Sequence, residues 1–260
     1  MLDKKGGTKM AGIKLDKMLV TKLPKKPVAG KPIIVVSVSG GKDSIGMWLA
    51  MWKRKVPNLV PVSFMGGWEW ECVDKTIHRA ELITGIPCTF LRYPRGFDGI
   101  LKDRGWPSWR VRWCTGMKRD KLMRFISSVR RGNPGFKVLS AIGIAADEKI
   151  RLAKEYGKRP DIIFPLASWG IKEAHCLRIC ASNGIDFSGH YLVRKRQGCW
   201  CCPWQSINDW RVLYEYHPEK WKRLVEMNRW APKGRKFSWA QMTLGALSKK
   251  LAAESKKGMI

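Results

Sequence analysis

The sequence predicts an α/β protein: a doubly wound parallel sheet followed by a smaller C-terminal satellite rich in cysteine and tryptophan. Three observations predict this fold. Apolar, β-branched runs alternate with segments of helical periodicity over roughly the first 165 residues, which is the pattern of parallel strands joined by helices. The first run, Ile33 to Val38, is continuously apolar and ends in a glycine-rich turn, as expected of a strand covered on both faces. A Cys- and Trp-rich segment then begins at Gly198.

Each element follows from this alternation. The chain of 260 residues is large enough for one such domain with appendages. Because successive strands are separated by helical segments, the connections are expected to be right-handed crossovers within one sheet. The predicted strands are residues 33–38, 59–64, 88–91 and 137–144, and the predicted helices are residues 44–53, 71–84, 118–130 and 171–182.

The turn after the first strand is suited to hold a phosphate. Gly40 and Gly41 leave no Cβ in the way and permit φ > 0, so that successive N–H groups can point into one concavity. Ser39 and Ser44 add hydroxyls, and the helix that follows directs its positive end at the same point. The spacing of a Walker loop is missing. Asp43 is placed to hold a metal ion that bridges to pyrophosphate.

The motif SGGKDS resembles the pyrophosphatase loop of the ATP-pyrophosphatase family, which includes adenylyl-sulfate and phosphoadenylyl-sulfate reductases, tRNA thiolation enzymes and DNA phosphorothioation proteins. The resemblance implies an adenine nucleotide alpha hydrolase-like fold that binds ATP with Mg²⁺. A second segment, GIAADEKIR, resembles a family segment near the adenosine phosphates, although Ala145 stands where the family has its first arginine. The nucleotide-binding residues implied in this way are Ser39, Gly40, Gly41, Lys42, Asp43, Ser44, Glu148 and Arg151.

The cysteines form the second motif. Cys199 and Cys202 make a C-x-x-C pair whose two thiolates can bind one metal ion. Cys114 lies 85 residues upstream of Cys199, and Cys176 and Cys180 lie one helical turn apart on the same predicted helix face. A site of this kind suits either iron or zinc, and reduced structural cysteines are the simplest alternative.

The spacing of Cys114, Cys199 and Cys202 is similar to that of the cysteines that bind a four-iron cluster in adenylyl-sulfate reductases, with Lys118 in the basic position of that motif. Trp113 replaces the fourth cysteine. Two arrangements therefore stay open. These three cysteines hold a [4Fe–4S] cluster with one open iron, similar to that of cluster-dependent tRNA thiolases, or Cys176 or Cys180 completes a four-thiolate site for Zn²⁺ or a closed cluster.

The charge of the chain points to a polyanionic partner. Of the formal net charge of +29, residues 1–31 account for +7 and residues 246–260 for +3, which leaves +19 on the residues between them. Nucleic acid is the favoured partner for so basic a protein. No run of eighteen apolar residues and no secretory signal is evident, so we expect no membrane association and a cytoplasmic location.

Four segments are predicted from these features: a flexible basic arm (residues 1–31), a nucleotide-binding domain (32–165), a Cys/Trp-rich distal region (166–245) and a basic tail (246–260). The favoured function is ATP-dependent sulfur transfer to nucleic acid, either tRNA thiolation or DNA phosphorothioation. A sulfur donor protein would supply the sulfur, and Asp43, Lys118 and Cys114 are the candidate catalytic residues. Two alternatives remain. One is an adenylyl-sulfate or phosphoadenylyl-sulfate reductase, which the lack of a cysteine after Cys202 disfavours. The other is a non-catalytic nucleic-acid-binding or assembly protein.

Overall fold

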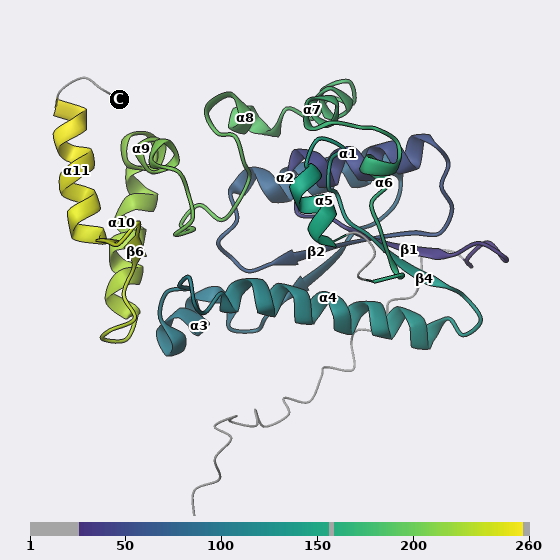
Figure 1. The fold of residues 1–260 in the computed structure, drawn as a ribbon, viewed down its shortest axis with the longest axis horizontal. Helices are drawn as coiled ribbons and strands as arrows, with labels where there is room; N and C mark the ends of the chain where they lie inside the picture. The colour runs from purple at the N-terminus through teal and green to yellow at the C-terminus, as the bar shows by residue number, and fades with distance from the viewer. Residues whose placement is uncertain (1–25, 156–158, 257–260) are drawn as a thin grey trace, which may run out of the picture.

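The computed structural model describes residues 26–155 and 159–256. Five parallel strands form one sheet in the order β3-β2-β1-β4-β5, with helices on both of its faces (Figure 1). The predicted α/β class with a parallel sheet and flanking helices is therefore confirmed. The strands are β1 (Ile33–Ser37), β2 (Leu59–Met65), β3 (Thr89–Arg92), β4 (Val138–Ala141) and β5 (Ile162–Ile163).

The central strand β1 shows why its sequence is apolar without alternation. Ile33 and Val35 belong to the core beneath helix α4 (Trp113–Gly132), whereas Ile34 and Val36 belong to the core beneath α1 (Lys42–Lys53) and α2 (Glu71–Thr84). Successive side chains of a strand point to opposite faces, so both faces must be apolar when both are covered. Figure 1 shows α1 and α2 on one side of the sheet and α4 on the other.

Several boundaries differ from the predictions. The helix expected from Lys118 begins at Trp113, and a helix that was not predicted, α3 (Gly96–Arg104), precedes it. The buried Trp113 lies against Trp68 and Phe97 and donates its indole N–H to Gly105 O at 3.1 Å. Its tertiary contacts therefore stabilise a first helical turn that has little local periodicity.

The distal region is mostly helical and shares its core with the first domain. Helix α7 packs against α1, and the ring of Phe237 lies 5.2 Å from that of Trp106, which precedes α4. Aromatic pairs of this kind contribute beyond the area they bury. The remaining elements are α5 (Lys149–Glu155), α6 (Pro165–Ser168), α7 (Glu173–Ala181), η1 (Phe187–Gly189), α8 (His190–Val193), α9 (Ile207–Tyr216), α10 (Pro218–Trp230), β6 (Ser238–Trp239), β7 (Met242–Thr243) and α11 (Leu244–Lys256).

The structure describes little of the predicted basic arm but most of the predicted basic tail. Most of the basic arm, residues 1–25, lies outside the described residues. The basic tail expected over residues 246–260 is a helix over its described part, α11, because Leu244, Leu247 and Leu251 recur at helical spacing and are buried. Within the described residues, no helix has the length and apolar character that crossing a bilayer requires.

Candidate functional site

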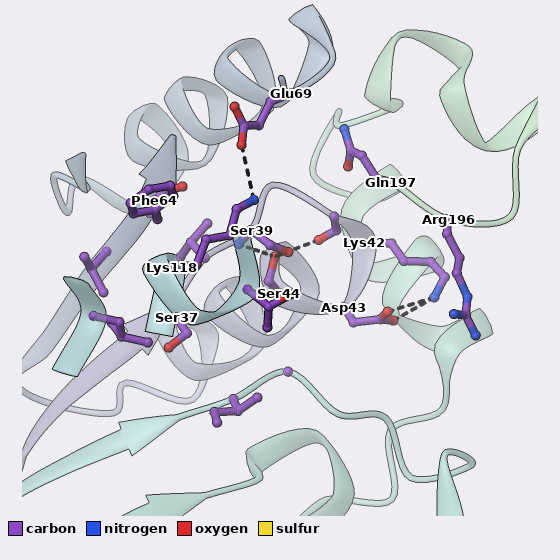
Figure 2. A pocket seen from close by; sticks show the side chains of 18 of the residues that line it. Ser37, Ser39, Lys42, Asp43, Ser44, Phe64, Glu69, Lys118, Arg196 and Gln197 are labelled. Atoms are coloured by element: carbon purple, nitrogen blue, oxygen red, sulfur yellow. Dashed lines mark hydrogen bonds and ion pairs between the residues drawn. The ribbon is translucent and has the colours of Figure 1, made fainter. Parts of the chain in front are cut away.

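A cavity of about 680 Å³ lies where the carboxyl ends of the central strands meet (Figure 2). The strand order reverses direction at β1, with β2 on one side and β4 on the other, and ligands of open α/β sheets bind at such a switch point. Gly143, after β4, packs so closely on the loop after β1 that a Cβ there would lie 3.0 Å from Asp43 O. The cavity is therefore built around the SGGKDS loop.

The loop is held in shape by its own hydroxyls. Ser39 N donates to Ser44 Oγ at 3.1 Å, and Ser44 Oγ donates to Gly41 O at 3.0 Å. Gly40 has φ +79°, and a Cβ at this position would lie 2.6 Å from Val73 Cγ1. Only glycine fits there, because a side chain would meet both a strained backbone and a collision. The loop thus ends at the N-terminus of α1, where backbone N–H groups favour an anion.

Lys42 and Asp43 form a charged group at the mouth of the loop. Lys42 Nζ donates to Asp43 Oδ1 at 2.9 Å and to Glu173 Oε2, on α7, at 2.6 Å. Burial raises the pKa of Asp43 although Lys42 opposes the shift, and the two carboxylates raise the pKa of Lys42 although burial opposes it. Asp43 and Glu173 are both hydrogen-bonded to Lys42 and line the cavity, and carboxylate oxygens are the ligands that Mg²⁺ prefers.

The segment after β4 contributes Glu148 and Arg151, two of the predicted nucleotide-binding residues, to the cavity. Glu148 and Arg151 both line the cavity, and Arg151 Nη1 lies 3.0 Å from Glu148 Oε2. Glu148 also accepts a hydrogen bond from Ala145 N at 3.1 Å. Ala145, where the family pattern has arginine, is fully buried. Arg151 is therefore the cation of this segment that reaches the cavity.

Tyr191 and the run Lys195 to Gln197 form the opposite wall, which sequence reasoning missed. The Tyr191 hydroxyl accepts a hydrogen bond from Lys42 N at 2.8 Å. Arg196 and Gln197 face the loop from across the cavity (Figure 2). No local signal links residues 149 positions apart; the run Arg194 to Arg196 was only a basic stretch in the sequence.

Lys118 connects the cavity to the cysteines. Its side chain, on α4, lines the cavity, and its Nζ lies 3.3 Å from Glu69 Oε1 (Figure 2). Burial lowers the pKa of Lys118, but the neighbouring Cys199 sulfur and the Glu69 carboxylate, which accepts a hydrogen bond from Lys118, outweigh that effect, and the net shift is upward. Lys118 thus lines the cavity around the loop and also interacts with two of the predicted cysteines, Cys114 and Cys199, which do not line that cavity themselves.

Cys114, Cys199 and Cys202 lie near one another and near Lys118. Cys199 interacts electrostatically with both of the other thiols, and burial raises its pKa to about 12 and the pKa of Cys202 as well. Their sulfurs are suitable ligands for iron or zinc. However, within residues 26–155 and 159–256 no three Cys, His, Asp or Glu side chains are arranged as a metal-binding group.

The structure places Cys176 and Cys180 elsewhere. Both are fully buried between α7 and α1: Cys180 Sγ donates to Lys42 O at 3.6 Å, and a Cβ on Gly46 would lie 3.1 Å from the Cβ of Cys176. Burial raises the pKa of both thiols, that of Cys180 to about 12. Their periodic spacing places them in a helix interface, and they do not join the other three cysteines as the four-thiolate alternative requires.

Comparison with known proteins adds no family assignment. No protein-family model matches the chain, and no curated protein matches it. The interpretation of the site therefore depends on its own residues: a glycine-rich loop at the switch point of the sheet, a set of cations around it and a group of thiols that interact with Lys118.

Proposed function

We propose that this protein is an ATP-pyrophosphatase-type enzyme of the adenine nucleotide alpha hydrolase-like fold that adenylylates a nucleic acid and then transfers sulfur to it. The observation that carries the proposal is the position of Lys118, which lines the cavity around the loop and interacts with Cys114 and Cys199. A nucleotide bound at the loop and a sulfur bound at the cysteines would therefore meet in one cleft.

The cavity has the two chemical parts that ATP needs. The loop, the N-terminus of α1 and the cations Arg151 and Arg196 provide for the phosphates. Val38, Phe64 and Ile142, at the ends of three strands, line the apolar part and suit a planar base. Asp43 and Glu173 would hold the Mg²⁺ ion, which neutralises charge that develops on the phosphates.

In the first step an oxygen of the nucleic acid attacks the α-phosphorus of ATP, and pyrophosphate leaves. The adenylylated oxygen is then a good leaving group. In the second step the terminal sulfur of a persulfide on Cys114 attacks the activated atom and AMP leaves. Cys114 lies in the first turn of α4 and one turn from Lys118, so that the helix dipole and the ammonium both stabilise negative charge on that sulfur.

The product of the second step is joined to Cys114 through a disulfide. A neighbouring thiol, Cys199 or Cys202, attacks the Cys114 sulfur, forms a protein disulfide and releases the sulfur-containing product as a thiolate. A sulfur donor protein and a thiol reductant would then restore the persulfide. A cluster or zinc ion bound by the same cysteines would instead supply a site that binds sulfide.

The test is production of AMP and pyrophosphate by the full chain with Mg²⁺, with and without an unmodified tRNA transcript or a DNA duplex. Pyrophosphate release that requires one of these nucleic acids is the expected result. Asp43→Asn should lower the rate by about 100-fold or more, because a metal-binding carboxylate at the transferred phosphate is lost. Asp120→Asn, on the exposed face of α4, is the control. Wild-type protein that neither binds ATP nor releases pyrophosphate would refute the proposal.

A further inference from the structure

A second cavity, of about 970 Å³, shares no lining residue with the cavity around the nucleotide loop. Its walls are the segment between α3 and α4, the turn after Cys202, and the segment before and within the β6–β7 hairpin. We call it the tryptophan groove. Its lining includes Trp106, Trp109, Val111, Trp204 and Arg235.

The groove borders the proposed sulfur site directly. Trp113 lines the groove and is followed by Cys114, and Pro203 lines it and is preceded by Cys202. Arg112 acts electrostatically on Cys202. Thr115 and Lys118, within the first two turns of α4, line the nucleotide cavity instead. The thiols therefore lie between the two cavities.

The tryptophans of the groove differ in what they do. Trp106 and Trp113 pack into the aromatic core, whereas Trp109 is 86% exposed. The ring of Trp204 is half-buried and lies 4.6 Å from the Arg112 guanidinium. An exposed indole and an Arg–Trp pair beside one cavity form a stacking platform for planar bases. The buried Trp106 Nε1 also has no hydrogen-bond partner among the described residues.

The charge of the groove complements a polyanion. Arg235 lines the groove, and Arg110 and Arg112 stand next in the chain to the lining residues Trp109 and Val111 without lining it themselves. None of these three arginines forms an ion pair with a described residue, and the described lining of the groove contains no acidic side chain. Elsewhere in the same end of the molecule arginines are paired, as Arg211 is with Glu254 at 2.9 Å. Unpaired guanidinium groups next to an exposed aromatic ring are typical of surfaces that bind single-stranded nucleic acid.

We propose that the tryptophan groove binds an unpaired stretch of the nucleic-acid substrate, with a base stacked on Trp109 and phosphates contacted by Arg110 and Arg235. This inference rests on the proposed function for the identity of the substrate. The groove lies beyond the nucleotide cavity and next to the thiols, so a strand bound in it presents its target nucleotide to the cysteine end of the cleft.

The test is fluorescence anisotropy with a fluorescein-labelled, 12-nucleotide single-stranded RNA, with the full chain and no ATP. Trp109→Ala should weaken binding about tenfold, since one stacked base is lost. Arg110→Ala should weaken binding and lower its dependence on salt, since a phosphate contact is lost. The matched control is Trp52→Ala. Trp52 is also exposed and stands next to a basic residue, Lys53, near the end of α1, but it does not line the groove.

Two results would overturn the inference: wild-type affinity in Trp109→Ala, or binding of a duplex of the same sequence as tightly as the single strand. Circular dichroism of each variant keeps a folding defect apart from a binding defect. ATP binding, measured by titration with the nucleotide, should be unchanged in Trp109→Ala. Binding of the RNA that depends on Trp109 in a protein that never releases pyrophosphate would support the groove and refute the proposed function.

Discussion

Two pairs of cysteines of similar spacing have different surroundings in this molecule. Cys176 and Cys180 lie on α7 and are sealed against α1, whereas Cys199 and Cys202 lie in a turn and face Lys118 and Cys114. A helix places residues four apart on one face, and here that face is the interior. The comparison shows that similar cysteine spacing can place thiols in very different surroundings, so the spacing alone does not indicate a functional site.

The largest expected difference between the pairs concerns sulfur transfer. Cys114→Ser should abolish incorporation of sulfur from a labelled persulfide donor into nucleic acid, because a hydroxyl cannot carry the sulfur, while pyrophosphate release persists. Cys180→Ala, at the other pair, should retain sulfur transfer. Counting labelled nucleic acid measures both variants. Full transfer by Cys114→Ser would contradict the assignment of Cys114.

The two cysteine pairs should also differ in whether their substitution removes a bound metal. If the cluster or zinc predicted from the sequence is present, Cys202→Ser should lose it, because a thiolate ligand is removed, and Cys180→Ala should keep it. Iron, zinc and sulfide are measured in protein purified without oxygen. Wild-type protein free of both metals would contradict the metal prediction and leave the persulfide route.

Thiol reactivity should differ by about 100-fold or more between Cys114 and Cys180. Cys180 is fully buried and its pKa is raised to about 12, so at pH 8 about one thiol in ten thousand is ionised. Alkylation of both cysteines by iodoacetamide is followed in the folded protein, where burial limits both the access to Cys180 and its ionisation. Mass spectrometry of time points measures the rates, and equal rates at the two cysteines would contradict the structure.

For stability, substitution of the buried Cys180 should have a larger effect than substitution of the turn cysteine Cys202. Cys180→Ala removes a sulfur from a sealed interface and should lower the free energy of unfolding by about 1–2 kcal/mol, as a small cavity does. Cys202→Ala, at a partly exposed position, should change it by less than about 0.5 kcal/mol in metal-free protein. Urea denaturation under reducing conditions measures both. A larger loss in Cys202→Ala would indicate that the turn cysteines are structural.

The smallest effect on stability is expected at Asp43, which interacts with Cys176 and Cys180. Burial raises its pKa, so between its unfolded and folded pKa values the folded state binds the proton more tightly, and stability falls as the pH rises through that window. Asp43→Asn cannot ionise and should therefore be slightly more stable than wild type at pH 7, with less difference at pH 3. Urea denaturation at both pH values measures this, with Asp120→Asn as the control; a variant that is less stable at pH 7 contradicts it.

Local pattern predicted most of the sheet domain. The continuous apolar run at β1 and the helical periodicity of Glu71–Thr84 are read directly from neighbouring residues, and both elements appear where expected. The start of α4 at Trp113 and the helix α3 were missed, because packing against Trp68 and Phe97 stabilises turns with weak local signals. The tail was missed for the opposite reason: the apolar spacing of α11 was present but hidden among lysines.

The sequence by itself determined the parallel sheet, the shape of the SGGKDS loop and the residues most suited to bind phosphate, because these depend on backbone freedom and periodicity within a few residues. Only the tertiary structure decided that Glu173 pairs with Lys42 and that the Tyr191 hydroxyl accepts a hydrogen bond from Lys42 N. It also decided that Cys114 rather than Cys176 lies near the C-x-x-C pair. Those contacts join segments up to 149 residues apart. Which of many chemically similar side chains meet there depends on how the helices pack on the sheet, and local sequence does not encode that.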